Sequence, residues 1–251
     1  AYDGHVVAIA GSVGKTTTAA LTAAVLGQNV DSLPTENFGE TLLEEQLLAI
    51  DQGAPHAILE LHADKMGVLE SAIHLSRPNF VVEIHPEPGE SSSTDASVSH
   101  CRELMALLPD DSNLIVGPVD GGLARGLQQC DAMTFGREGS CLVSATHVLC
   151  NQGELTFAVD GQVARVKTWG RHFLDNALAA WAVGRAAGID ERTIAKRLSR
   201  ARLPGRRCHI TQSGELTLID DTACRNSLAR RASLELLSSL PGSPRLVIDW
   251  D

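Results

Sequence analysis

The sequence predicts an α/β fold: a mostly parallel sheet with a phosphate-binding loop (P-loop), flanked by helices and joined to a small antiparallel sheet. Short apolar runs alternate with segments of helical period, which is typical of a parallel sheet covered by helices. The first apolar run passes into a glycine-rich turn followed by lysine and threonines. At residues 141–168 the apolar period becomes two, which predicts the separate antiparallel sheet.

The expected elements can be placed along the chain. Apolar runs predict strands at 5–10, 57–61, 80–84 and 114–117. Apolar residues at helical spacing predict helices at 68–75, 98–108, 174–187, 191–199 and 227–240. Turn-forming residues predict a loop at 86–93 and hairpin turns at 151–153, 160–161 and 213–214. A final strand is expected at 245–248, in the same sheet as the first 30 residues.

Composition limits the classes of function. The 251 residues suffice for one large domain, or a domain with a small subdomain, and no linker separates two halves. The net charge of −10 argues against a nucleic-acid partner. No apolar run is long enough to cross a membrane and no signal peptide is recognisable, so a cytoplasmic protein is expected. The six cysteines lack CxxC spacing, which favours free thiols over a zinc site built from distant cysteines.

The strongest motif is the glycine-rich turn after the first strand. Glycines let backbone N–H groups approach phosphate oxygens, and the start of the next helix adds positive potential. The lysine would reach the terminal phosphates, and the first threonine hydroxyl would ligate Mg²⁺. A plain glycine turn before a surface helix is the alternative. The predicted nucleotide-binding residues are Gly11, Ser12, Val13, Gly14, Lys15, Thr16 and Thr17.

Four segments together resemble the central ATP-binding domain of the Mur ligases, most closely the MurF-like branch. They are GSVGKTTT at 11–18, AILELHADKMG at 57–67, GRHFLDNALAA at 170–180, and LPGR with LIDDT at 203–222. Their order and spacing match the family over nearly the whole chain. The resemblance implies ligation with ATP and Mg²⁺, in which a substrate carboxylate is phosphorylated and an amine then takes the acyl group. The family also has an N-terminal domain for a UDP-sugar substrate and a C-terminal domain for an amino acid or peptide. Neither is expected within 1–251.

The resemblance assigns roles to five further positions. Glu60, at a strand's carboxyl end, would hold Mg²⁺ beside Thr16, and Asn176 would lie beside adenine. Arg206 would contact the phosphates, so that Lys15, Glu60 and Arg206 form the expected catalytic set. Asp221 matches a ribose-binding aspartate, and Asn226 matches the last residue of the family's YNAN segment. Four of these positions have a structural alternative: Glu60 could be a solvent-facing glutamate, Asn176 part of an exposed helix face, Arg206 part of a basic surface patch, and Asn226 a helix N-cap.

The sequence departs from the family pattern at the second metal. The family holds this ion with a histidine and a carbamoylated lysine, which align with Gly89 and Cys101 here. His85 is the nearby histidine that could substitute, whereas no lysine occurs between Lys65 and Lys167. Phe173 stands where the family's GRHN segment has asparagine, and His62 stands where the family usually has a glycine after Leu61. The segment 223–226 lacks the tyrosine and the first asparagine of YNAN.

Three functions are therefore open. The first is the core of a MurF-like ligase that acts on a carboxylate-bearing peptide or UDP-sugar peptide through domains outside this chain. The second is a catalytically degenerate relative that binds nucleotide or a protein partner as a scaffold. The third is a ParA/MinD-like ATPase. That class needs a lysine where Ala10 stands, and it lacks the LPGR and LIDDT segments.

Overall fold

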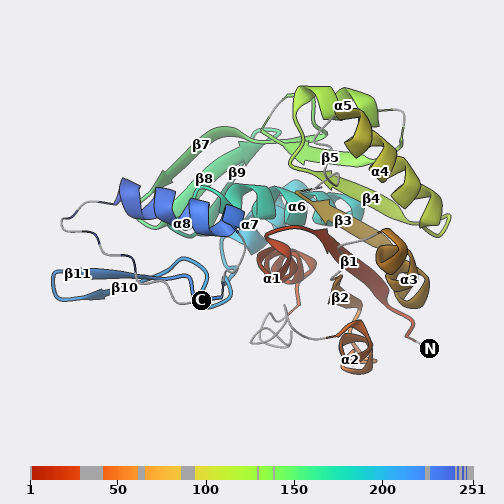
Figure 1. Cartoon of the computed structure of the whole chain (residues 1–251), viewed down its shortest axis with the longest axis horizontal. Coiled ribbons are helices and arrows are strands. Elements are labelled where there is room, and N and C mark those ends of the chain that lie inside the picture. The colour runs from red at the N-terminus through yellow and green to blue at the C-terminus, as the bar shows by residue number, and fades with distance from the viewer. Residues whose placement is uncertain are drawn as a thin grey trace. The chain divides into compact units, whose positions relative to one another are not determined.

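A six-stranded sheet forms the centre of the first of two compact units, Ala1–Pro204 and Gly205–Asp251. The structure is a computed structural model, and it describes residues 2–28, 42–61, 66–85, 94–128, 130–137, 139–223, 227–240, 242, 245 and 247. The strand order is β2-β1-β3-β4-β5-β6, with parallel pairing throughout (Figure 1). The strands are β1 (His5–Gly11), β2 (His56–Glu60), β3 (Phe80–Ile84), β4 (Asn113–Gly117), β5 (Met133–Gly136) and β6 (Val143–Ser144).

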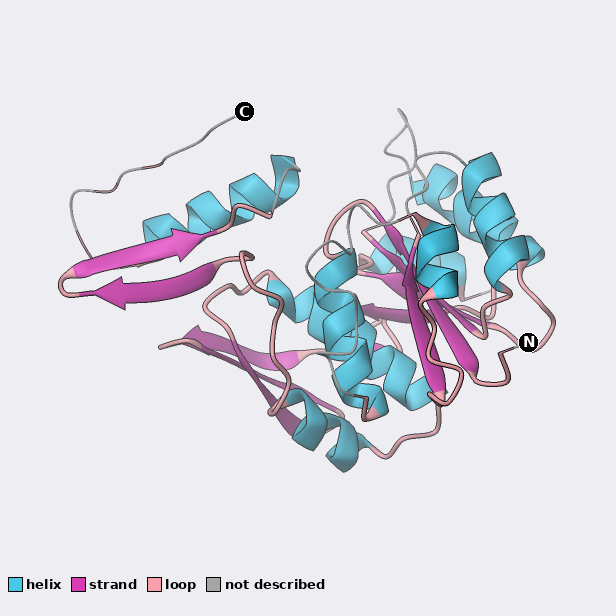
Figure 2. Ribbon diagram, turned by 90° about the horizontal axis from the view of Figure 1, so that it is seen from below, coloured by secondary structure: helices cyan, strands magenta, loops and turns pink. Residues whose placement is uncertain are grey.

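Helices cover both faces of this sheet, as the alternating pattern predicted. The helices of this unit are α1 (Lys15–Leu26), α2 (Leu43–Leu48), α3 (Met66–Ser76), α4 (Thr94–Leu107), α5 (Gly121–Leu127), α6 (Phe173–Ala186) and α7 (Glu191–Leu198), and α7 packs against α1, α6 and β9. Helices α1 and α6 pack together on one face, whereas α3, α4 and α5 cover the other (Figures 1 and 2). These are called the α1/α6 face and the α4 face below.

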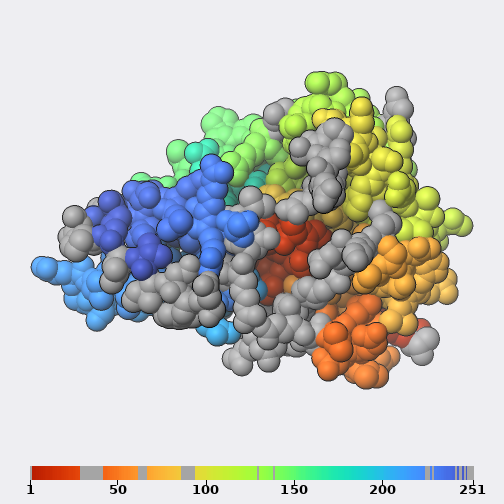
Figure 3. All heavy atoms as spheres, viewed as in Figure 1, coloured from red at the N-terminus to blue at the C-terminus, as the bar shows by residue number. Residues whose placement is uncertain are grey.

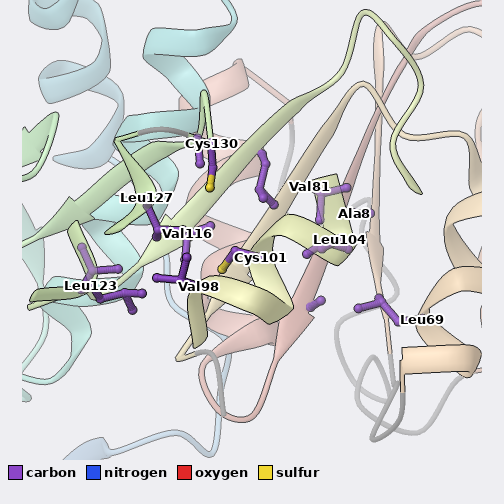
Figure 4. Close-up of a cluster of buried hydrophobic side chains, with 14 of the residues drawn as sticks. Ala8, Leu69, Val81, Val98, Cys101, Leu104, Val116, Leu123, Leu127 and Cys130 are labelled. Carbon is purple, nitrogen blue, oxygen red and sulfur yellow. The ribbon is translucent and has the colours of Figure 1, made fainter. Parts of the chain in front are cut away.

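The pleat of the sheet decides which face receives each side chain. Ala8, Val81 and Val116 enter an apolar cluster with residues of α3, α4 and α5, among them Leu104 and Cys101 (Figure 4). Because consecutive side chains on a strand alternate between faces, their neighbours in sequence point to the α1/α6 face. The β-branched and small apolar residues of the strands suit burial on both sides.

The small antiparallel sheet is confirmed, with a later start than predicted. It contains β7 (Thr146–Asn151), β8 (Glu154–Val159) and β9 (Gln162–Lys167). Val143 and Ser144 instead extend the main sheet by pairing with β5. Both predicted turns have two consecutive residues with positive φ, Gln152-Gly153 and Asp160-Gly161. That conformation joins strands whose twist is right-handed.

The second unit contains the predicted hairpin and the predicted helix. The hairpin pairs β10 (His209–Ser213) with β11 (Leu216–Asp220), and α8 spans Ser227–Ser239 (Figure 2). Of the strand expected at 245–248, the structure describes Arg245 and Val247, and neither lies in a strand. The predicted loop at 86–93 lies outside the described residues. Elements α2, α5, β5 and β6 were not predicted because their apolar runs are short.

Two expectations from composition can be examined in the described part of the chain. No helix there is long and apolar enough to span a membrane. Its five cysteines, at positions 101, 130, 141, 150 and 208, are all free thiols. Among the same residues, no group of three or more His, Cys, Asp or Glu side chains is arranged to hold a metal ion.

Candidate functional site

The glycine-rich loop between β1 and α1 has a backbone that only glycine accommodates at both ends. Gly11 has φ 118°, and a Cβ atom there would lie 1.8 Å from the carbonyl oxygen of Ile84. Gly14 has φ 84°, and its Cβ atom would lie 2.3 Å from Nδ2 of Asn176. The loop is therefore packed closely against β3 and α6, and side chains at these positions would displace it.

The first turn of α1 leaves its backbone N–H groups available to an anion. It has no acidic residue and no side-chain cap, so the positive end of the helix is not neutralised locally. Lys15 Nζ donates to the carbonyl oxygen of Gly11 at 2.7 Å, which holds the ammonium group over the loop. Residues 11–15 are partly exposed, and atoms of this N-terminal segment (red) reach the surface in Figure 3. Thr17, predicted with the loop, is buried in α1.

Thr16 and Glu60 meet beside the loop, as the sequence predicted for a metal site. The Thr16 hydroxyl donates to Oε2 of Glu60 at 3.1 Å, and both side chains are buried. The register places Glu60 opposite Ile9, on the α1/α6 face. A hydroxyl and a carboxylate are oxygen ligands of the kind that Mg²⁺ prefers. The pair therefore fits one Mg²⁺ ion, whose remaining ligands would be phosphate and water oxygens.

Gln46 is a site residue that the sequence did not reveal. Its Oε1 accepts from the Glu60 N–H at 2.8 Å, and its Nε2 donates to the Glu60 carbonyl at 3.0 Å. The Gln46 side-chain amide thus pairs with both backbone polar groups of Glu60, as a neighbouring strand would, and holds the Glu60 backbone in place. Gln46 lies in α2, a helix of six residues, so no pattern in the sequence identified it.

Asn176 binds the loop through two hydrogen bonds. Its Nδ2 donates to the Gly14 carbonyl at 3.0 Å and to Oγ1 of Thr18 at 3.0 Å. The same Gly14 carbonyl accepts the α1 hydrogen bond from Thr18 N at 2.8 Å. Asn176 is buried, which excludes the alternative of an exposed helix face. Its contact with adenine remains a prediction.

The end of β3 supports the other side of the loop. The Ser12 hydroxyl donates to the His85 carbonyl at 3.0 Å, and the His85 N–H donates to the Gly117 carbonyl at 2.7 Å. His85 has φ 50°, which turns the chain away from the strand. His85 thus contributes main-chain support to the loop, and its role as a substitute metal ligand remains a prediction.

Glu83 is a second buried carboxylate, on the opposite face. The register pairs it with Ala10, so it points to the α4 face, where its Oε1 lies 3.8 Å from Nε2 of His100. Its Oε2 has no hydrogen-bond partner among the described residues. The interaction with Glu83 raises the pKa of His100 although burial opposes it, and the charge of Glu103 adds to the rise. When His100 is protonated, the two groups form an ion pair in a largely apolar setting.

Cys101, which the resemblance aligns with the family's carbamoylated lysine, has surroundings that do not suit a metal ligand. Cys101 is fully buried among Val98, Leu104 and Val116 (Figure 4). Burial, with smaller contributions from the charge of Glu83 and from Cys130, raises the pKa of its thiol to about 12. A protonated thiol in an apolar cluster is a poor ligand for Mg²⁺. Gly89, the position of the family histidine, lies outside the described residues.

The predicted site residues of the second unit have local contacts of their own. Arg206 is exposed, has φ 56°, and its carbonyl accepts from Ala223 N at 3.0 Å. Asp221 Oδ1 accepts from Cys208 N at 2.8 Å, and its Oδ2 accepts from the Ser233 hydroxyl of α8. Asp221 therefore joins the base of the hairpin to α8. Asn226 lies outside the described residues, and the ligand contacts of all three remain predictions.

Known proteins resemble this chain in both sequence and fold. It is 27% identical to a UDP-N-acetylmuramoyl-tripeptide–D-alanyl-D-alanine ligase of Synechocystis sp., over 97% of this chain and 54% of the relative. It is 28% identical to the Bacillus subtilis ligase of the same name, over 95% of this chain and 54% of the relative. The chain thus spans about half the length of these relatives.

Solved structures share the fold. A MurF crystal structure from Acinetobacter baumannii matches with a TM-score of 0.77 and 23% identity, over 95% of this chain and 55% of that one. MurF from Thermotoga maritima, solved in complex with ADP, matches with a TM-score of 0.76 and 19% identity, over 96% and 58% of the two chains. The Mur ligase middle domain model matches residues 9–184, which contain the end of β1, the loop, Glu60 and Asn176. These matches set aside the ParA/MinD alternative, and the chain belongs to the Mur ligase family as a MurF-like member.

Proposed function

We propose that this chain binds ATP with one Mg²⁺ ion and is the nucleotide-binding core of a MurF-like carboxylate–amine ligase. The observation that supports this most strongly is the Thr16–Glu60 contact of 3.1 Å beside an uncapped helix N-terminus. It brings a hydroxyl and a carboxylate from two separate motifs to the place where a P-loop presents its phosphates. The Mur ligase relatives and the neighbour solved with ADP support the same ligand.

The residues of this chain would divide the work of holding the nucleotide. Backbone N–H groups of the loop would bind phosphate oxygens, and Lys15 would exchange its contact with Gly11 for one with the terminal phosphates. Thr16 and Glu60 would hold Mg²⁺, which when bound neutralises phosphate charge. Arg206 is proposed to contact the phosphates, and Asp221 and Asn226 the ribose and nearby groups. The substrate whose carboxylate is phosphorylated would be a peptide or a UDP-sugar peptide, and the names of the relatives, UDP-N-acetylmuramoyl-tripeptide ligases, support the second.

One observation favours the second candidate, a nucleotide-binding or scaffolding protein without ligase activity. The position of the family lysine is Cys101, whose protonated thiol is enclosed by apolar side chains. A chain with this residue cannot form the carbamate on which the family's second metal depends. Binding of nucleotide and turnover must therefore be measured separately.

Calorimetric titration with ATP and Mg²⁺ tests the proposal. We expect micromolar binding by the wild-type chain and at least about 100-fold weaker binding by Lys15→Ala, because the lysine supplies the cation nearest the terminal phosphates. Lys167→Ala, at the end of β9, is the matched control and should bind like wild type. Equal binding by wild type and Lys15→Ala would refute the nucleotide site. Phosphate release on adding carboxylate peptides, in the full-length protein, separates the ligase from the scaffold.

A further inference from the structure

We infer that Arg137 is a positioning residue for the nucleotide loop, acting through Asp175 and Asn176 at the start of α6. The inference rests on the proposed nucleotide site. No sequence motif includes Arg137, which directly follows β5 at the carboxyl edge of the sheet. Its side chain connects that edge to the helix whose asparagine binds the loop.

The connection begins with a two-point contact between Arg137 and Asp175. Nε of Arg137 donates to Oδ1 at 3.4 Å, and Nη2 donates to Oδ2 at 3.3 Å. The Asp175 side chain is 9% exposed, whereas that of Arg137 is 47% exposed. A buried carboxylate needs a partner, and a guanidinium that binds both oxygens also fixes the orientation of the carboxylate. The Arg137–Asp175 pair therefore anchors the first turn of α6.

The next residue transmits this anchoring to the loop. Asn176 follows Asp175 directly, and its Nδ2 makes the 3.0 Å bonds to the Gly14 carbonyl and Thr18 Oγ1. The close approach of Nδ2 to Gly14 leaves no room for a Cβ atom, so a small shift of α6 changes the loop. Because the N–H groups of the first turn have no partners within the helix, the position of that turn depends on contacts with other parts of the chain. The contact of Arg137 with Asp175 anchors this turn and so keeps Nδ2 of Asn176 within hydrogen-bonding distance of the Gly14 carbonyl.

Binding of a fluorescent ATP analogue, together with NMR of the side-chain amide of Asn176 and the backbone amide of Gly14, tests this. Arg137→Met should bind the analogue about tenfold more weakly and shift both signals. Arg137→Lys should recover part of the affinity, since one of the two contacts can re-form. Arg165→Met is the control, because Arg165 makes an exposed pair with Glu154 in the antiparallel sheet, 59% and 48% exposed.

A double-mutant cycle distinguishes positioning from a general loss of structure. In an Asn176→Ala background, Arg137→Met should weaken binding no further, because the group that it positions is gone. Fully additive losses would overturn the inference, as would unmoved Gly14 and Asn176 signals in folded Arg137→Met. If Arg137→Met fails to fold, Arg137→Met/Asp175→Asn removes the buried charge and should still show the shifted signals. Shifted signals in a chain that binds no nucleotide would support the positioning role and refute the proposed function.

Discussion

The two faces of the central sheet each carry a buried glutamate near the same edge, and the two differ in their partners. Glu60, on the α1/α6 face, accepts a hydrogen bond from Thr16, and Gln46 satisfies its backbone. Glu83, on the α4 face, lies 3.8 Å from His100 and beside the buried thiol of Cys101. One carboxylate lies beside the glycine-rich loop with polar neighbours, and the other is enclosed by packing. The comparison teaches that a buried carboxylate is a candidate ligand site when polar groups that could share a ligand lie beside it.

The largest expected effect comes from restoring the family's lysine on the α4 face. Cys101→Lys places an ammonium group in a fully buried cluster, and we expect a loss of about 4 kcal/mol in the free energy of unfolding. Urea denaturation measures it. Arg102→Lys, on the exposed side of the same helix, should change stability by less than about 0.5 kcal/mol. A Cys101→Lys protein as stable as wild type would show that this face has room for a polar site.

On the α1/α6 face, Gly14→Ala should lower the free energy of unfolding by about 3 kcal/mol. The added Cβ atom meets Asn176 Nδ2 at 2.3 Å in a backbone with φ 84°, so strain and the loss of two hydrogen bonds combine. Gly161→Ala has nearly the same φ, 81°, but nothing within 4 Å of its Cβ atom. It isolates the backbone strain, about 1 to 2 kcal/mol. Equal losses in the two variants would contradict close packing of Asn176 on the loop.

Exchanging each glutamate for glutamine separates the two faces by function. Mg²⁺ should increase the nucleotide affinity of wild type, and in Glu60→Gln this increase should be about tenfold smaller, because a neutral amide is a weaker ligand than a carboxylate. Glu83→Gln should leave that gain unchanged, since Glu83 points to the other face. Titrations with and without Mg²⁺ measure both. A loss of the Mg²⁺ effect in Glu83→Gln would show that the α4 face contributes to the metal site.

The smallest effect is the pH dependence of the Glu83–His100 pair. Glu83 raises the pKa of His100, so protonated His100 stabilises the fold below its unfolded pKa of about 6.5. This contribution, about 1 kcal/mol or less, is lost as the pH rises through the higher pKa of the folded state. The free energy of unfolding of wild type should include this contribution at pH 5.5 and lack it at pH 8, whereas Glu83→Gln should lack it at both pH values. An NMR titration that gives His100 the same pKa in both proteins would contradict the pairing.

The sequence by itself determined the features whose cause is local. Apolar runs and helical spacing gave the parallel sheet, the antiparallel sheet and the hairpin at 209–220, because these patterns decide which residues can be buried in a strand or helix. The motif at 11–18 predicted the loop, and Glu60 was placed at a strand end. Short elements such as α2 and β6 lacked enough apolar residues to be recognised.

Only the tertiary structure decided which distant groups meet. Asn176 and Gly14, 162 positions apart, are joined by packing of α6 on α1, and Arg137 reaches Asp175 because β5 ends beside α6. The face that receives Glu60 or Glu83 depends on strand register, and a shift of one residue would exchange the faces. Such relations arise between elements, so no pattern within one segment contains them. The loop motif predicted a phosphate site, and the packing of α2, β2 and α6 around the loop determined its geometry.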